Sequence, residues 1–241
     1  MTATAVSVSR TQRARPLAYE PGAAPGRWRG PGPEIWLVDS RGGDPRPLGA
    51  EAVLDAAERT RADMYRREEH RRIYVATHVA LRMLLGTYLE EDPAAVLLVR
   101  EDCPGCGKPH GRPAVSGSPL HFSVSHSEGV ALLAFAGSPV GVDIERPPAL
   151  DALSHLLPSL HARERAELAA LPPAERAVAF AACWTRKEAY LKGIGIGLAA
   201  GPHRHYVGGG SQAAPTPGWT LTDVTAPDGF MAACAVRNRD L

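Results

Sequence analysis

The chain has only four cysteines, almost no net charge and no long apolar run in its 241 residues. Cys183 and Cys234 are isolated in the sequence, which argues against a disulfide framework and predicts a reducing, cytoplasmic location. A formal charge of +1 gives no overall attraction to nucleic acids or anionic membranes. No apolar stretch is long enough for a membrane span, and residues 1–15 lack the apolar segment of a secretory signal. We therefore predict a cytoplasmic protein that binds neither nucleic acid nor membrane.

Composition divides the chain into a tail and two halves. Residues 1–33 are rich in Ala, Gly, Pro and Arg and cannot bury enough apolar area to become ordered, so we predict a mobile N-terminal tail. The whole chain is 44% hydrophobic, which is ample for a packed core. A Gly-Ser-Pro break at 137–139 separates an N-terminal half, 34–138, from a C-terminal half, 139–241. Strands and helices are expected in both halves, so the fold class is α+β and an internal duplication stays open.

Apolar periodicity predicts the individual elements. Helices are expected at 51–61, 66–88 and 174–192, with a broken helical region at 149–171. Strands are expected at 34–38, 95–100, 121–126, 130–136, 140–145, 219–224 and 230–236.

The segment 184–192 is free of Pro and Gly and is followed by a glycine-rich turn, so it predicts the end of a helix. Trp184, Glu188 and Lys192 are spaced by four and share one side of that helix. Lys187 points about 100° away from Glu188, which predicts a structural or ion-pair role. Taken alone, a Glu–Lys pair at this spacing is usually a solvated surface pair.

Segment 140–145 alternates strictly, so its aliphatic residues occupy one face of a strand and Asp143 and Glu145 occupy the other. Acidic residues on an open strand face are ordinary by themselves. Together with Glu188 and Lys192, they would form a magnesium and phosphate site.

Three further stretches leave alternatives open. Ser125 and His126 are adjacent in a strand and point to opposite faces, which excludes a dyad; they favour phosphate binding or a polar strand end. A basic cluster is either an anion-binding rim or a solvated helix face interleaved with glutamates: Arg59, Arg61, Arg66, Arg67, Arg71 and Arg72. Cys103 and Cys106 form half of a zinc ribbon, but His110 does not complete four ligands, so the spacing favours a turn that contains thiols over zinc.

Four motifs in order resemble the Sfp-type 4'-phosphopantetheinyl transferases. Each motif is weak alone, but their order, spacing and the chain length agree with that family. The motifs are Gly111-Arg112-Pro113, Phe122-Ser-Val-Ser125-His126-Ser127, Val140-Gly-Val-Asp143-Ile-Glu145 and Trp184-x-x-Lys187-Glu188-Ala189-x-x-Lys192-x-x-Gly195. The resemblance implies two similar α/β halves packed as a pseudo-dimer within one monomeric chain, with coenzyme A between them.

The resemblance also implies the reaction. Phosphopantetheine would pass from coenzyme A to a Ser of an apo acyl or peptidyl carrier protein in a Mg2+-dependent transfer that releases adenosine 3',5'-bisphosphate. The family resemblance favours polyketide or non-ribosomal peptide synthases, as in antibiotic biosynthesis, over a dedicated fatty-acid role.

Site residues follow from the matched positions. Asp143 and Glu188, with Glu145 as a third ligand, would hold Mg2+, and Lys192 would stabilise the leaving oxygen. Glu188 is also the candidate base for the incoming Ser. Contacts with coenzyme A are implied for Arg112, Ser125, His126, Lys192, Arg72 and, more loosely, Arg59 and Arg61.

Three features depart from the family pattern. Ser123 replaces a more usual Asn, Cys103 and Cys106 are not part of the pattern, and the loop after Leu198 is longer in Gly and Pro. Two rival functions are a metal-dependent nuclease, which the low net charge disfavours, and a binding module that holds coenzyme A without turnover.

Overall fold

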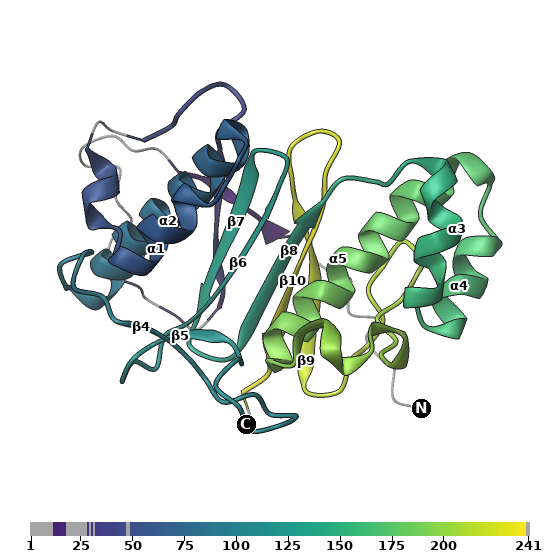
Figure 1. Cartoon of the computed structure of the whole chain (residues 1–241). Coiled ribbons are helices and arrows are strands. Elements are labelled where there is room, and N and C mark those ends of the chain that lie inside the picture. Colours follow the sequence, from purple (N-terminus) through teal and green to yellow (C-terminus); the bar gives the residue numbers. More distant parts are fainter. Residues whose placement is uncertain (1–11, 18–27, 29, 31, 47–48, 240–241) are drawn as a thin grey trace.

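The computed structural model describes residues 12–17, 28, 30, 32–46 and 49–239. Two β-sheets meet at the centre, and helices cover their outer sides (Figure 1). The larger sheet has the order β2 (Arg15–Pro16), β3 (Glu34–Asp39), β7 (Val130–Ala136), β6 (His121–Ser127), β5 (Pro113–Val115) and β4 (Leu98–Arg100). The smaller sheet has the order β1 (Gln12–Arg13), β9 (Trp219–Thr225), β10 (Met231–Arg237) and β8 (Val140–Glu145).

One long helix dominates each side of the molecule. On the side of the larger sheet, α2 (Glu68–Leu89) follows η1 (Ala50–Val53) and α1 (Ala56–Asp63). On the other side, α5 (Arg176–Ile194) lies beside α3 (Leu153–Leu156) and α4 (Ala162–Ala169). Short 3-10 turns join these elements: η2 (Leu150–Ala152), η3 (Leu157–Ser159), η4 (Pro173–Glu175), η5 (Gly197–Ala200) and η6 (Pro202–Arg204). The predicted α+β class is confirmed by the helices and the two mostly antiparallel sheets.

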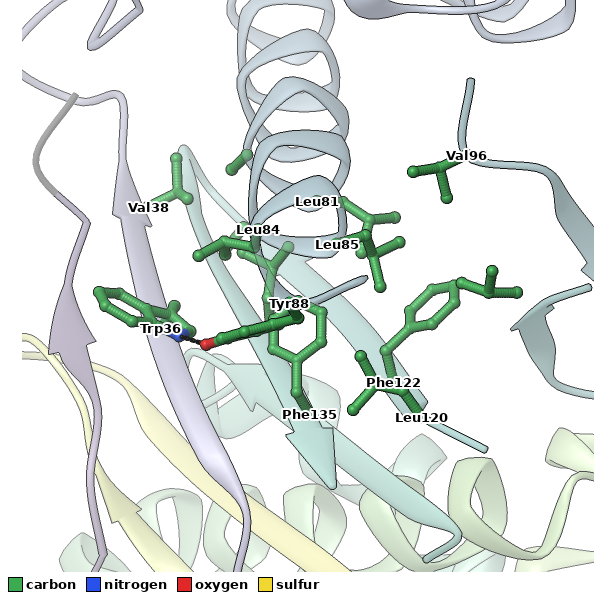
Figure 2. Close-up of a cluster of buried hydrophobic side chains, with 14 of the residues drawn as sticks. Trp36, Val38, Leu81, Leu84, Leu85, Tyr88, Val96, Leu120, Phe122 and Phe135 are labelled. Atoms are coloured by element: carbon green, nitrogen blue, oxygen red, sulfur yellow. Dashed lines mark hydrogen bonds between the residues drawn. The ribbon is translucent and has the colours of Figure 1, made fainter. Parts of the chain in front are cut away.

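Helix α2 packs an apolar stripe onto the larger sheet, as Figure 2 shows for part of this core. Phe122 and Phe135 supply the facing strand residues. The indole of Trp36 donates a hydrogen bond of 2.8 Å to the hydroxyl of Tyr88, so this buried N–H has a partner. The stripe consists of Ile73, Ala76, Ala80, Leu84 and Tyr88.

Strand β7 is buried on both faces, which explains its unbroken apolar sequence. Ala131, Leu133 and Phe135 pack under α2, whereas the alternate residues pack against β8 of the smaller sheet. A two-residue turn, with positive φ at Glu128 and Gly129, joins β6 to β7 in register. The residues of β7 that face β8 belong to a second hydrophobic cluster, which holds the two sheets together. This cluster includes Val130, Leu132, Ala134, Ala136, Val140, Val142, Ile144 and Cys234.

The prediction of a mobile tail over 1–33 is wrong for residues 12–16. Gln12 pairs in parallel with Val224, and Arg15 pairs with Trp36, so this segment adds one short edge strand to each sheet. Ala14 is buried between the two pairings. Composition could not predict these strands, because edge pairing uses backbone N–H and C=O groups, which depend little on the type of residue. Most of the predicted tail lies outside the described residues.

Other boundaries differ from the predictions by a few residues. Strand β4 starts at Leu98 rather than at residue 95, and β5 was not predicted because its three residues are too short for a period. The boundary between the halves at 138 and 139 stays a prediction. No helix among the described residues is long and apolar enough to cross a membrane.

Candidate functional site

The C-terminal turns of α5 lie directly on β8. A Cβ added to Gly141 would lie 1.9 Å from the carbonyl oxygen of Ala189, so only glycine allows this approach. Gly193, on the next turn of the helix, lies over the same strand. Because the backbones are so close, Glu188 and Lys192 come next to the acidic face of β8, and Gly195 ends the helix in a left-handed conformation.

Lys192 and Asp143 form the centre of the site. The Lys192 Nζ donates hydrogen bonds to Asp143 Oδ1 at 2.7 Å, to Ser125 Oγ at 2.9 Å and to the Val142 carbonyl at 3.2 Å. Asp143 is 2% exposed, whereas the Lys192 side chain is 29% exposed. The predicted meeting of the helix cation with the strand carboxylate is therefore present.

Three alternate serines of β6 connect this site to the other sheet. Ser123 Oγ accepts a hydrogen bond from the Val142 N–H at 3.1 Å. Ser125 Oγ donates to Asp143 Oδ1 at 2.7 Å, and Ser127 Oγ donates to Glu145 Oε2 at 2.8 Å. The period of two places all three hydroxyls on one face, so the alternation of serines in the sequence is a signal from which this ladder could have been predicted.

The second oxygen of Asp143, Oδ2, is buried without a hydrogen-bond partner. Burial raises the pKa of Glu188, and the charges of Asp143 and Glu145 raise it further. Burial and Asp143 likewise raise the pKa of Glu145 above its ordinary value, against the hydrogen bond from Ser127. A bare buried oxygen among mutually repelling carboxylates is the environment that a hard cation relieves.

The residues therefore fit Mg2+, which prefers oxygen ligands. In the described part of the chain, the oxygens of these three carboxylates do not form a group within 4.8 Å of one another. A shared ion would thus require the half-buried Glu145 and Glu188 side chains to turn towards Asp143.

A cavity of ≈ 630 Å³ opens beside Lys192, between the two halves. Arg112 lines it and ties the halves together, since its guanidinium donates to Glu101 Oε2 at 2.6 Å and to the Gly193 carbonyl at 2.6 Å. Its other lining comes from α1, α2, β4, β6 and the end of α5. The volume and the lining charges suit a polar ligand of small-molecule size.

The remaining predicted ligand contacts are dispersed. Ser125 faces Asp143, whereas the neighbouring His126 lies on the opposite face of β6 and is exposed. Partial desolvation lowers the pKa of His126, and the charges of Lys192 and His78 lower it further. Arg59 donates to the Leu54 carbonyl, and neither it nor Arg72 lines the cavity. Their contacts with coenzyme A stay predictions.

Sequence reasoning missed a buried ion network on the cavity wall. Arg82 is 1% exposed and donates to Glu58 Oε2 at 2.5 Å and to Asp55 Oδ2 at 2.6 Å. His78 contacts the other oxygen of Glu58 at 2.8 Å. Glu58, Asp55 and His78 all line the cavity. No local period marks these residues, because their partners lie on different helices.

Residues 139–226 match the family described as the 4'-phosphopantetheinyl transferase superfamily. The 4'-phosphopantetheinyl transferase HetI of Nostoc sp. is 34% identical over 194 residues, which cover 77% of this chain and 79% of the relative. The chain belongs to this superfamily. A phosphopantetheinyl transferase of Thraustochytrium sp. is 32% identical over 187 residues, covering 71% of this chain and 64% of that protein.

The 4'-phosphopantetheinyl transferase Sfp of Bacillus subtilis is 30% identical over 138 residues, covering 55% of this chain and 60% of the relative. The chain is accordingly a phosphopantetheinyl transferase enzyme, while the Sfp type within the superfamily stays a prediction. The family match contains Asp143, Glu145, Glu188 and Lys192.

Proposed function

We propose that this transferase moves 4'-phosphopantetheine from coenzyme A to a Ser of an apo carrier protein in a Mg2+-dependent reaction. The observation that carries the proposal is the buried, unpartnered Oδ2 of Asp143, whose other carboxylate oxygen accepts a hydrogen bond from Lys192 on the wall of the cavity. A carboxylate in that state has not completed its ligands, and the cavity gives a phosphate-bearing substrate access to Lys192.

Asp143, Glu145 and Glu188 would hold Mg2+, which when bound supplies positive charge to the pyrophosphate of coenzyme A. Lys192 adds a second positive charge from the other side of Asp143. Because Asp143 and Ser125 fix its ammonium, Lys192 is oriented before substrate arrives and needs no reorganisation.

In the proposed step, the hydroxyl oxygen of the carrier Ser attacks the phosphorus atom attached to pantetheine. The new O–P bond forms as the P–O bond to adenosine 3',5'-bisphosphate breaks, and the nucleotide leaves with the bridging oxygen. Glu188, at the position that the resemblance assigns to the base, takes the hydroxyl proton. Lys192 stabilises the charge that develops on the leaving oxygen.

Coenzyme A would occupy the cavity, with Arg112 on its wall. Arg112 is already fixed by Glu101 and Gly193, so it offers a positioned charge to a phosphate group. His126, Ser125, Arg72 and Arg59 are proposed as further contacts with the nucleotide part.

The proposed partners are acyl or peptidyl carrier proteins of polyketide or non-ribosomal peptide synthases, as the resemblance to the Sfp type implies. We further propose a monomer, because two sheets already share one core within the single chain. We also propose a cytoplasmic location, because the few, isolated cysteines predict a reducing compartment. A patch of arginines near the start of α2 suits an acidic helix on the carrier.

The test is intact-mass analysis of several apo carrier proteins incubated with the enzyme, coenzyme A and Mg2+, with a matched sample in EDTA. We expect a gain of one phosphopantetheine on a carrier Ser, and no gain in EDTA. Coenzyme A binding without any transfer would instead support a binding module, and transfer unaffected by EDTA would remove the role of Mg2+.

A further inference from the structure

The loop between β4 and β5 gathers three side chains that the transfer reaction does not use. Cys103 Sγ, Cys106 Sγ and a ring nitrogen of His110 lie within 4.8 Å of one another. Among the described residues, no other group of three or more His, Cys, Asp or Glu side chains has its ligand atoms this close together. Cys106 Sγ and His110 Nε2 are 3.0 Å apart. Zn–S bonds of about 2.3 Å and Zn–N bonds of about 2.0 Å put tetrahedral ligand atoms roughly 3.5–3.8 Å apart, so small shifts suffice.

The backbone of the loop already has a tight, closed form. The N–H groups of Cys106 and Gly107 donate to the Cys103 carbonyl at 3.2 Å and 2.8 Å, and the Cys103 N–H donates to the Lys108 carbonyl at 2.8 Å. Gly107 has φ +71°, a left-handed conformation that glycine adopts without strain. The two sulfurs are therefore held on the same side of the turn before any metal arrives.

The four cysteines divide into two kinds. Cys183 and Cys234 belong to hydrophobic clusters, and burial raises the pKa of the Cys234 thiol to about 12. Cys103 is also buried, yet it belongs to none of the hydrophobic clusters of the described residues. Packing in the core thus explains Cys183 and Cys234, whereas the Cys103 sulfur lies close to the ligand atoms of Cys106 and His110 instead.

We propose that Cys103, Cys106 and His110 bind a zinc ion, with water as the fourth ligand. Cys106 and His110 are exposed, so the ion has a path from solvent. Two thiolates and an imidazole are ligands that Zn2+ prefers, and three protein ligands plus water are an established arrangement for this ion.

The ion would brace the wall of the cavity. A Cβ added to Gly105 would lie 3.5 Å from Ile196 Cγ2, and Gly195 lies against Pro104, so the loop rests on the end of α5. His110, Arg112 and Ile196 line the cavity. This consequence rests on the proposed function, because it concerns coenzyme A, but the zinc site itself does not.

The experiment measures metal content rather than activity. The full chain, free of any affinity tag and purified under reducing conditions, is analysed for zinc by elemental analysis. We expect about one zinc ion per chain. Substitutions Cys103→Ser, Cys106→Ser and His110→Ala should each lower zinc affinity by more than about tenfold, since even outer-shell changes cost about 10–100-fold. Cys183→Ala, which removes a thiol in the hydrophobic core, is the matched control and should retain the metal.

A second measurement guards against variants that do not fold. Wild-type protein is stripped of metal with a chelator and titrated with Co2+, which gives thiolate charge-transfer absorption and strong visible bands in a tetrahedral site. Absence of these bands after reduction would overturn the proposal, as would equal zinc in wild type and Cys106→Ser. If Cys103 and Cys106 form a disulfide in the purified protein, and the reduced protein binds no Co2+, the two residues are a redox pair instead.

A final readout links the site to coenzyme A. If zinc braces the cavity wall, Cys106→Ser should raise the KM for coenzyme A more than it lowers kcat. Unchanged KM, with zinc lost, would keep the metal site and refute the brace. Zinc binding stays measurable even if no carrier protein is modified, so the two proposals fail separately.

Discussion

Helix α5 carries two lysines on neighbouring turns that form ion pairs of different kinds. Lys187 and Glu164 are both 0% exposed, and their charged atoms lie 2.9 Å apart. Every oxygen of Glu164 is occupied, because the N–H groups of His161 and Val207 also donate to it. Lys187 completes its donors on the carbonyls of Pro202 and His205. The predicted ion-pair role of Lys187 is confirmed.

The pair of Lys192 and Asp143 resembles the pair of Lys187 and Glu164, but one of its carboxylate oxygens has no hydrogen-bond partner. Asp143 Oδ2 has no hydrogen bond, and Lys192 is partly open to the cavity. A buried charge that is fully paired has no capacity for a further ligand, whereas a buried charge that is left incomplete marks a place where another group can bind. The difference predicts a structural role for Lys187 and supports the proposed role of Lys192 in chemistry.

The largest expected effect is on activity at the incomplete pair. Glu188→Gln should reduce kcat by at least about 10²–10⁴-fold, because it removes both the proposed base and a metal ligand. The fold should persist, since Gln keeps the shape of the half-buried side chain. Initial rates of carrier modification measure kcat, and circular dichroism checks the fold. The exposed Glu175→Gln at the start of α5 is the control and should leave the rate unchanged; normal turnover by Glu188→Gln would refute the site assignment.

The next effect is on stability at the complete pair. Lys187→Met leaves the Glu164 carboxylate buried without its cation, so the free energy of unfolding should fall by about 3–5 kcal/mol. Urea unfolding followed by circular dichroism measures this change. The activity per folded molecule should stay the same, because Lys187 does not face the cavity.

The double variant Glu164→Gln, Lys187→Met sharpens this test. Removing both charges should recover part of the lost stability, since no uncompensated charge stays buried. The amide oxygen introduced by Glu164→Gln can still accept the hydrogen bond from the Val207 N–H. Wild-type stability in Lys187→Met would show that the pair does not hold the fold.

The smallest effect is a pH dependence confined to the incomplete site. Burial and neighbouring negative charge raise the folded-state pKa values of Glu145 and Glu188 above the ordinary 4.5. From pH 4.5 up to the raised pKa values, the folded state binds more protons than the unfolded state, so the free energy of unfolding falls as pH rises. Urea unfolding in EDTA at several pH values should show this decrease in wild type. The double variant Glu145→Gln, Glu188→Gln should lack it, and parallel curves for both proteins would contradict the prediction.

Local sequence patterns predicted the elements that carry the site. The helical spacing of Trp184, Glu188 and Lys192 and the alternation of Asp143 and Glu145 follow from backbone geometry within a few residues, which the sequence states directly. Strands at 219–224 and 230–236 are predicted on the same grounds, and β9 and β10, which pair antiparallel, confirm them. Patterns of this kind cannot say which element lies next to which.

Contacts between distant residues decided the rest. Four features depend on contacts that no sequence period encodes. They are the approach of α5 to β8 over Gly141, the Glu58–Arg82 network, the pairing of residues 12–16 with both sheets, and the burial of Cys103 beside Cys106. The sequence by itself determined that a carboxylate strand and a Glu–Lys helix exist. Only the tertiary structure decided that Asp143 would be buried with one oxygen bare, because burial and partner choice depend on what the whole chain packs around that atom.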